Sequence, residues 1–186
     1  MFGSDYYGME PDIITIAKGL TSAYAPLSGS IVSDKVWQTL EQGTDEFGPI
    51  GHGWTYSAHP ICVAAGVANL QYIDDQNLIA NNTTTGDYFR AQLNERLGAH
   101  KHVGEIRGVG MLAAIEFVQD QQQRQFFDSS AGIGPKIAGA LAAKGVIGRA
   151  MPQGDILGFA PPFCMTQAEA DIVVEATTSA VTEVLG

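Results

Sequence analysis

Hydrophobic and polar positions follow two different periods in successive parts of the chain. Short β-branched or apolar runs predict strands at residues 13–17, 30–33, 103–106, 111–118, 146–149 and 156–160. Apolar positions at helical spacing predict helices at residues 35–41, 60–73, 78–97 and 135–144 and after residue 166. Strands and helices interleaved in this way are typical of an α/β protein.

Several predicted helices carry local signals at their ends. Asp34 is placed to cap the helix at residues 35–41, and Pro60 suits the first turn of the next helix. Gly145 stands at the position after a helix end, where a left-handed residue is favoured. Thr166 with Glu169 three residues later has the pattern of a capping box, so a last helix begins there.

Other stretches lack a periodic pattern and predict loops or boundaries. Residues 1–8 are rich in Gly, Ser and Tyr, and residues 42–56 contain four glycines and one proline, so both are expected to be loops. Residues 74–77 interrupt the helical pattern, and residues 98–102 have the composition of a linker. We therefore predict one domain portion at residues 1–97 and a second domain at residues 98–186.

Composition and charge restrict the possible partners. The 186 residues are 45% hydrophobic, as in globular proteins, and 20 acidic against 10 basic residues give a net charge of −10. This charge disfavours nucleic acid and anionic membrane surfaces as partners. No apolar run is long enough to span a bilayer and no secretory signal is found, which predicts a cytoplasmic protein. Cys62 and Cys164 lie in apolar contexts that predict buried thiols, and no spacing predicts a metal site.

Lys18 is the first candidate for chemistry. It follows the buried strand predicted at residues 13–17, and Gly19 directly behind it permits a sharp turn. The ends of such strands are where α/β proteins place their active sites. Partial desolvation there would favour the neutral amine that Schiff-base chemistry needs. The alternative is an ordinary solvated lysine.

A glycine-rich stretch at residues 51–60 is the second candidate. It leads into a predicted helix and carries hydroxyl groups on Thr55, Tyr56 and Ser57. Backbone N–H groups and hydroxyls in such a loop can bind a phosphate. The alternative is a loop that only leads into the helix.

Arg149 is the third candidate, because it stands at the end of the strand predicted at residues 146–149. A guanidinium in that position can bind a carboxylate through two parallel hydrogen bonds. The alternative is a surface arginine that forms an ion pair with Asp155.

The segment PDIITIAKGLTSAYAPLSG at residues 11–29 resembles the active-site segment of the class III (omega-type) aminotransferases, which depend on pyridoxal phosphate. The resemblance extends along nearly all 186 residues. The residues after Lys18 are most similar to the branch of the family that uses pyruvate as amino acceptor. It implies that Lys18 carries the cofactor as an internal aldimine. It also implies that Thr55 donates to the cofactor phosphate of the neighbouring subunit and that Arg149 binds the substrate carboxylate.

The resemblance implies a fold as well as an activity. The expected fold is that of the fold-type I pyridoxal-phosphate-dependent transferases, with a partial large domain followed by a small C-terminal α/β domain. The expected reaction moves an amino group from an amine or amino acid donor to a keto acid such as pyruvate, in a homodimer.

Residues that the family uses for the cofactor ring and its phosphate correspond to positions before Met1. The chain is therefore expected to be the C-terminal part of an aminotransferase and to be poorly active alone. Two alternatives remain: a non-catalytic remnant or assembly fragment, and an aminomutase or racemase on the same fold.

Overall fold

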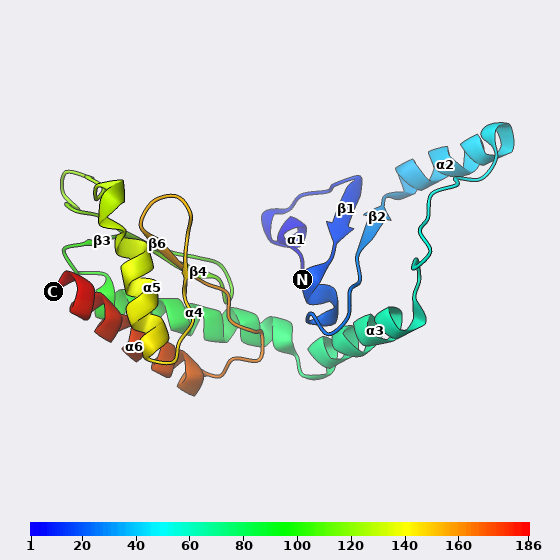
Figure 1. Cartoon of the computed structure of the whole chain (residues 1–186). Helices are drawn as coiled ribbons and strands as arrows, with labels where there is room; N and C mark the ends of the chain where they lie inside the picture. Colours follow the sequence, from blue (N-terminus) through cyan, green and yellow to red (C-terminus); the bar gives the residue numbers. More distant parts are fainter. The chain divides into compact units, whose positions relative to one another are not determined.

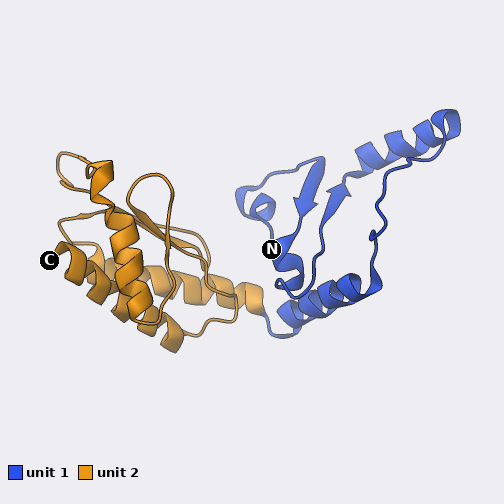
Figure 2. Ribbon diagram, in the orientation of Figure 1, with its two compact units in different colours: residues 1–77 blue, residues 78–186 orange.

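The computed structural model describes all residues, 1–186, and divides into two compact units. The first unit is Met1–Asn77 and the second is Leu78–Gly186 (Figure 2). Figure 1 labels the helices and strands of both units. No helix of the chain combines the length and apolar character needed to cross a bilayer.

The first unit is built around a two-stranded antiparallel ladder. Strands β1 (Ile13–Ile16) and β2 (Gly29–Val32) pair in register from Ile13 opposite Val32 to Ile16 opposite Gly29. Between them lies the short 3-10 helix η1 (Lys18–Thr21). The helices of this unit are α1 (Gly3–Tyr7), α2 (Asp34–Phe47) and α3 (Pro60–Asp75).

Asp12 ties the two strands together at the end of the ladder far from Lys18. Its carbonyl oxygen accepts a hydrogen bond from the Ser33 backbone at 2.9 Å, and its Oδ1 accepts one from the Ser33 hydroxyl at 2.8 Å. Lys35 Nζ lies 3.3 Å from Asp12 Oδ2. These contacts fix the register, because a slip of one residue would break all of them.

Two loop predictions in the first unit are wrong. Residues 3–7 form α1, and α2 continues to Phe47, six residues beyond the predicted end at residue 41. The helix continues through Gly43 because one glycine costs a helix only about 1 kcal/mol. It ends at Gly48, whose φ is +81°. The capping residue is Ser33 rather than the predicted Asp34, since the Ser33 hydroxyl accepts from the Val36 amide.

The second unit is a four-stranded antiparallel sheet packed against three helices. The sheet order is β3-β4-β6-β5, with β3 (Val103–Arg107), β4 (Ala113–Phe117), β5 (Arg149–Ala150) and β6 (Ile156–Phe159). The helices are α4 (Leu78–Leu97), α5 (Ile133–Ala143) and α6 (Gln167–Leu185), with the 3-10 turn η2 (Ser129–Ala131) before α5. The predicted bounds of α4 are confirmed, and so is the capping box of Thr166 and Glu169.

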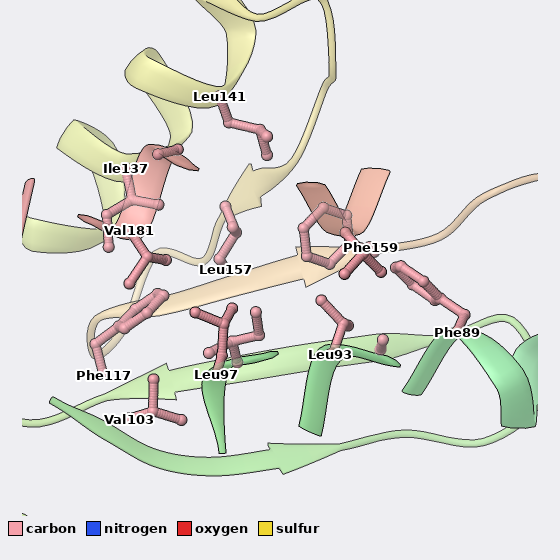
Figure 3. Packing of buried hydrophobic residues seen from close by; sticks show 14 of the residues in the cluster. Phe89, Leu93, Leu97, Val103, Phe117, Ile137, Leu141, Leu157, Phe159 and Val181 are labelled. Atoms are coloured by element: carbon pink, nitrogen blue, oxygen red, sulfur yellow. The ribbon is translucent and has the colours of Figure 1, made fainter. Parts of the chain in front are cut away.

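The hydrophobic core lies in the second unit, between the sheet and the helices (Figure 3). Alternate residues of β4 and β6 are buried, as expected for strands with one face toward a core. Phe89 of α4 and Phe159 of β6 meet edge to face, with ring centroids 5.7 Å apart. The labelled core side chains in Figure 3 are Phe89, Leu93, Leu97, Val103, Phe117, Ile137, Leu141, Leu157, Phe159 and Val181.

Helix α4 belongs to the second unit by its contacts. Its residues Phe89, Leu93 and Leu97 are buried in that core, and α6 and β3 are its neighbours. The compact units therefore divide at residue 77, whereas the domain border predicted from the sequence lies at residue 98. The assignment of residues 1–97 to a larger cofactor domain stays a prediction.

Candidate functional site

A pocket of about 830 Å³ lies in the first unit between the loop that follows β1 and the loop that precedes α3. The pocket brings together residues that are about 40 positions apart in the sequence. Its volume lies within the range typical of sites for small molecules, which is roughly 300–1,000 Å³. It is lined by Lys18, Ala23, Ala25, Pro26, Leu27, Ser28, Trp54, Tyr56, Ser57, Ala58 and Cys62.

Lys18 lines this pocket from the first position of η1, two residues after β1 ends. Its backbone is left-handed, with φ at +52°, a conformation that a residue with a side chain rarely adopts. The sequence predicted a partly desolvated amine, but Lys18 is exposed within this chain. The physical reason is that the first unit contains no buried apolar side chain to cover the turn.

The loop after Lys18 is held by a series of short-range hydrogen bonds. The amides of Leu20, Ser22 and Tyr24 donate to the carbonyls of Ala17, Gly19 and Thr21 at 3.1–3.2 Å. The hydroxyl of Thr21, which is 2% exposed, donates to the Ala25 carbonyl at 2.5 Å. The chain therefore turns sharply away from β1 and leaves Lys18 at the turn.

The loop that precedes α3 contributes Trp54, Tyr56, Ser57 and Ala58 to the lining of the pocket. The Trp54 amide donates to the Ser57 hydroxyl at 3.0 Å, and the Ser57 amide donates back to the Trp54 carbonyl at 2.9 Å. These two bonds close a turn that presents Tyr56 and Ser57 to the pocket. Thr55 is exposed, makes no hydrogen bond within the chain and does not line the pocket of Lys18.

One face of α3 closes the pocket and supports the Lys18 turn. Cys62, Gly66 and Asn69 recur at helical spacing along this face. Cys62 lines the pocket, Gly66 is buried, and Asn69 donates hydrogen bonds to the turn. The sequence reasoning missed Cys62 and Asn69 as site residues, although their spacing of i and i+7 on a helix with a buried glycine is a signal for a packed face.

The two cysteines differ from their prediction. Cys62 is half-buried and Cys164 is exposed, and both are free thiols. The apolar neighbours of Cys164 do not bury it, because it lies in the turn that precedes Thr166 rather than within an element.

Arg149 lies in the second unit, at the start of β5 and opposite Gly158 of β6. It is exposed, and no acidic side chain of the chain forms an ion pair with its guanidinium. The alternative pairing with Asp155 is not found, because Asp155 Oδ1 accepts instead from the Gly134 amide at 2.8 Å. The guanidinium is therefore free to bind an anion.

The residues around the pocket fit a phosphorylated aldehyde such as pyridoxal phosphate. An exposed lysine amine can react with an aldehyde, and the turn at residues 54–58 carries the Tyr56 and Ser57 hydroxyls. The rings of Trp54 and Tyr56 provide apolar surface beside them. No aspartate or glutamate lines the pocket, so this chain supplies no acidic partner for the nitrogen of a pyridine ring.

Comparison with protein families gives a match over residues 1–181 to the family described as aminotransferase class-III. A diaminobutyrate–2-oxoglutarate transaminase from Halomonas elongata is 55% identical over 183 residues, which are 98% of this chain and 39% of that protein. A putrescine–pyruvate aminotransferase from Pseudomonas aeruginosa is 37% identical over 174 residues, which are 93% of this chain and 36% of that protein.

A solved transaminase structure from a study of directed evolution by ancestral reconstruction superposes on this chain with a TM-score of 0.96. Its sequence is 58% identical, and the match covers 99% of this chain and 40% of that one. The chain thus spans about 40% of the length of the relatives that it matches.

Proposed function

Because the chain belongs to the class-III aminotransferase family, and its fold is part of a fold-type I pyridoxal-phosphate-dependent transferase, we propose that it provides the cofactor-bearing lysine of a transaminase. The single observation that carries this proposal is that Lys18 lines a pocket of about 830 Å³ together with Tyr56 and Ser57, which carry hydroxyl groups. Bound there, pyridoxal phosphate would act as the electron sink that amino-group transfer requires.

Lys18 has two roles in the proposed reaction. Its amine would hold the cofactor through the aldehyde group, and once an amino donor has taken its place, Nζ would serve as the base and acid that moves a proton at the substrate carbon. The left-handed start of η1 places Lys18 at the pocket wall, which keeps the displaced amine beside the reacting atoms.

Thr55 and Arg149 are proposed to serve the same reaction. We assign Thr55 to the cofactor phosphate of a neighbouring subunit in a homodimer, an assignment supported by its exposed and unbonded hydroxyl. We assign Arg149 to the carboxylate of an amino acid or keto acid, supported by its unpaired guanidinium. In the same proposal residues 1–97 belong to the large cofactor domain and residues 98–186 form the small domain.

The amino acceptor has two candidates. The resemblance of the segment after Lys18 to the pyruvate-using branch favours pyruvate, and a relative with 37% identity is named for it. The relative with 55% identity is named for 2-oxoglutarate instead. Both relatives carry the name of a donor with two amino groups, so a diamine or diamino acid is the donor class we propose.

Chemical labelling of the purified protein tests the role of Lys18. The protein is incubated with pyridoxal phosphate, reduced with borohydride and mapped by peptide mass spectrometry. We expect the label on Lys18 in preference to Lys35, Lys101, Lys136 and Lys144, and its loss in Lys18→Arg, which keeps the charge but forms no stable Schiff base. Equal labelling of all lysines would reject the proposal.

Arg149→Ala tests the carboxylate site in an active preparation of the enzyme. A charge-assisted, bidentate contact is worth about 1.5–3 kcal/mol, so kcat/KM for keto acids should fall about ten- to a hundredfold. Simple amines carry no carboxylate, and their kcat/KM should change little. The matched control is Arg96→Ala, which removes an exposed arginine paired with Glu175. Equal losses for both substrate types would contradict the role.

A further inference from the structure

The turn that carries Lys18 is held in a costly backbone conformation. Lys18, Ser22 and Ala23 all have positive φ, at +52°, +50° and +63°, and none of them is glycine. Residues with side chains adopt this region only where the surrounding structure holds them there. The bonds within η1 are local, so they do not by themselves fix the turn against the rest of the unit.

Asn69 of α3 forms hydrogen bonds to the same turn from a distant part of the sequence. Its Nδ2 donates to the Gly19 carbonyl at 3.0 Å and to the Leu20 carbonyl at 3.1 Å, from 50 and 49 positions further along the chain. Both acceptors belong to η1 and directly follow Lys18. One side-chain amide thus uses both of its donors on two successive peptide groups.

The backbone of α3 comes close to the turn beside Asn69. A Cβ built on Gly66 would lie 2.8 Å from Leu27 Cδ2 and 3.8 Å from Thr21 Cγ2, so a side chain there would push on the loop. Thr21 and Gly66 are the two fully buried residues of residues 1–77. The tightest packing of the first unit therefore lies where α3 contacts the Lys18 turn.

We propose that Asn69 is a positioning residue for Lys18. Its two hydrogen bonds hold η1 against α3 in the left-handed conformation that directs the Lys18 side chain into the pocket. This inference rests on the proposed function, in which Lys18 must meet an aldehyde in that pocket. Asn69 itself does not line the pocket, so its effect is exerted through the backbone of residues 19 and 20.

The experiment compares Asn69→Asp and Asn69→Ala with the original protein. Aspartate keeps the size and shape of asparagine but presents oxygens, not N–H donors, to the two carbonyls. Gln71→Ala is the matched control, because Gln71 is exposed on the same helix and its side chain forms no hydrogen bond in the chain. One readout is amide exchange at Leu20 and Ser22, measured by NMR. The other is the ratio of pyridoxal phosphate trapped on Lys18 to that trapped on Lys35.

Both Asn69 variants should accelerate exchange at Leu20 and Ser22 by about tenfold, the usual effect of losing a hydrogen bond. The ratio of label on Lys18 to Lys35 should fall severalfold in both, while Gln71→Ala leaves both readouts unchanged. The amides of the β1–β2 ladder report whether the unit keeps its fold. A positioning role requires them to keep their exchange rates.

Two outcomes would overturn the inference. Asn69→Asp could match the original protein in both readouts, which would mean that the donors do not matter. Both variants could also lose the protection of the β1–β2 ladder, which would make Asn69 a general support of the unit and not a positioning residue. A failure of the proposed function looks different: the original protein would then show no preference for labelling Lys18, whatever the exchange rates of the turn.

Discussion

The two compact units of this chain are each stabilised by a different kind of interaction. All the buried hydrophobic side chains lie between Phe89 and Val181, in the second unit. In the first unit only Thr21 and Gly66 are buried, and most of the large exposed hydrophobic side chains of the chain are found there. The second unit is thus stabilised by an apolar core, whereas the first depends on backbone ladders and polar side-chain contacts.

This difference separates the candidate chemistry from the core. The pocket of Lys18 lies in the unit without a core, so the direction of the amine depends on a few hydrogen bonds such as those of Asn69. Arg149 in contrast lies on a strand paired to β6, whose residues Leu157 and Phe159 are buried. Its backbone is therefore held by hydrogen bonds to a strand that the core fixes in place.

Hydrogen exchange should show the largest difference between the units. Amides of β4 and β6 open only when the core opens, so they should exchange roughly 10³-fold more slowly than amides of β1 and β2. The measurement is native-state exchange on the purified chain, followed by NMR or mass spectrometry. Equal protection of β1–β2 and β4–β6 would contradict the comparison, and would mean that the first unit is stabilised by more than its backbone ladder and polar side-chain contacts.

Gly86→Ala should strongly destabilise the second unit. A Cβ on Gly86 of α4 would lie 2.0 Å from the Gly110 carbonyl oxygen, and that oxygen is held in place by Arg90. Forcing α4 away from the loop should cost about 3 kcal/mol, at the upper end for overpacking. The matched control is Gly139→Ala in α5, which has open space and should stabilise by up to about 1 kcal/mol. Chemical denaturation measures both.

Arg107→Ala should have an intermediate effect on the second unit. Glu105 and Glu116 stand opposite each other in β3 and β4, and Arg107 Nη1 lies 2.7 Å and 2.6 Å from their Oε2 atoms. Hydrogen bonds to Glu116 first, and then to Glu105, raise the pKa of Arg107 above its usual range. Without it, two carboxylates face each other, so we expect a loss of about 1 kcal/mol that shrinks in high salt.

The control for Arg107 is Arg96→Ala, since Arg96 and Glu175 form an exposed pair 3.2 Å apart. Exposed pairs contribute little, so this variant should lose less than about 0.5 kcal/mol. Equal losses of stability at Arg96 and Arg107 would show that repulsion between the two facing carboxylates does not measurably destabilise the β3–β4 ladder.

His100 should give the smallest effect, which is a pH dependence of the stability of the second unit. Burial first, and then the nearby His102 and Lys101, lower the pKa of His100, whose Nε2 is buried without a hydrogen-bond partner. A lowered pKa means that the folded state binds fewer protons, so the contribution is complete above the ordinary value near 6.5 and is lost as the pH falls below it. Denaturation between pH 8 and pH 5 should show this slope, and His100→Gln should flatten it.

The same change at the exposed loop residue His52 serves as the control for His100. His52→Gln should leave the pH dependence of the second unit as it was. A slope that persists in His100→Gln would assign the pH dependence to another group.

Local signals in the sequence predicted much of the second unit but less of the first. The bounds of α4 and the cap of α6 follow from residues within a few positions of each end, so they could be read directly. The end of α2 could not, because Gly43 is a weak helix breaker whose effect depends on its neighbours. The position of Lys18 after a strand was predictable, but its support by Asn69 was not, because that contact spans 50 positions.

The packing of α4 on α6 also has a consequence for the order of events during synthesis. The contacts of α4 with α6, and with the turn before α6, join residues about 80 positions apart, as in the hydrogen bonds of Tyr88 to Asp171 and of Asn81 to Met165. At typical translation rates, α4 leaves the ribosome roughly 4–16 s before the helix that covers it. Phe89 and Leu93 remain without their final neighbours for that time, so chaperones that bind apolar segments can act on this helix before α6 is made.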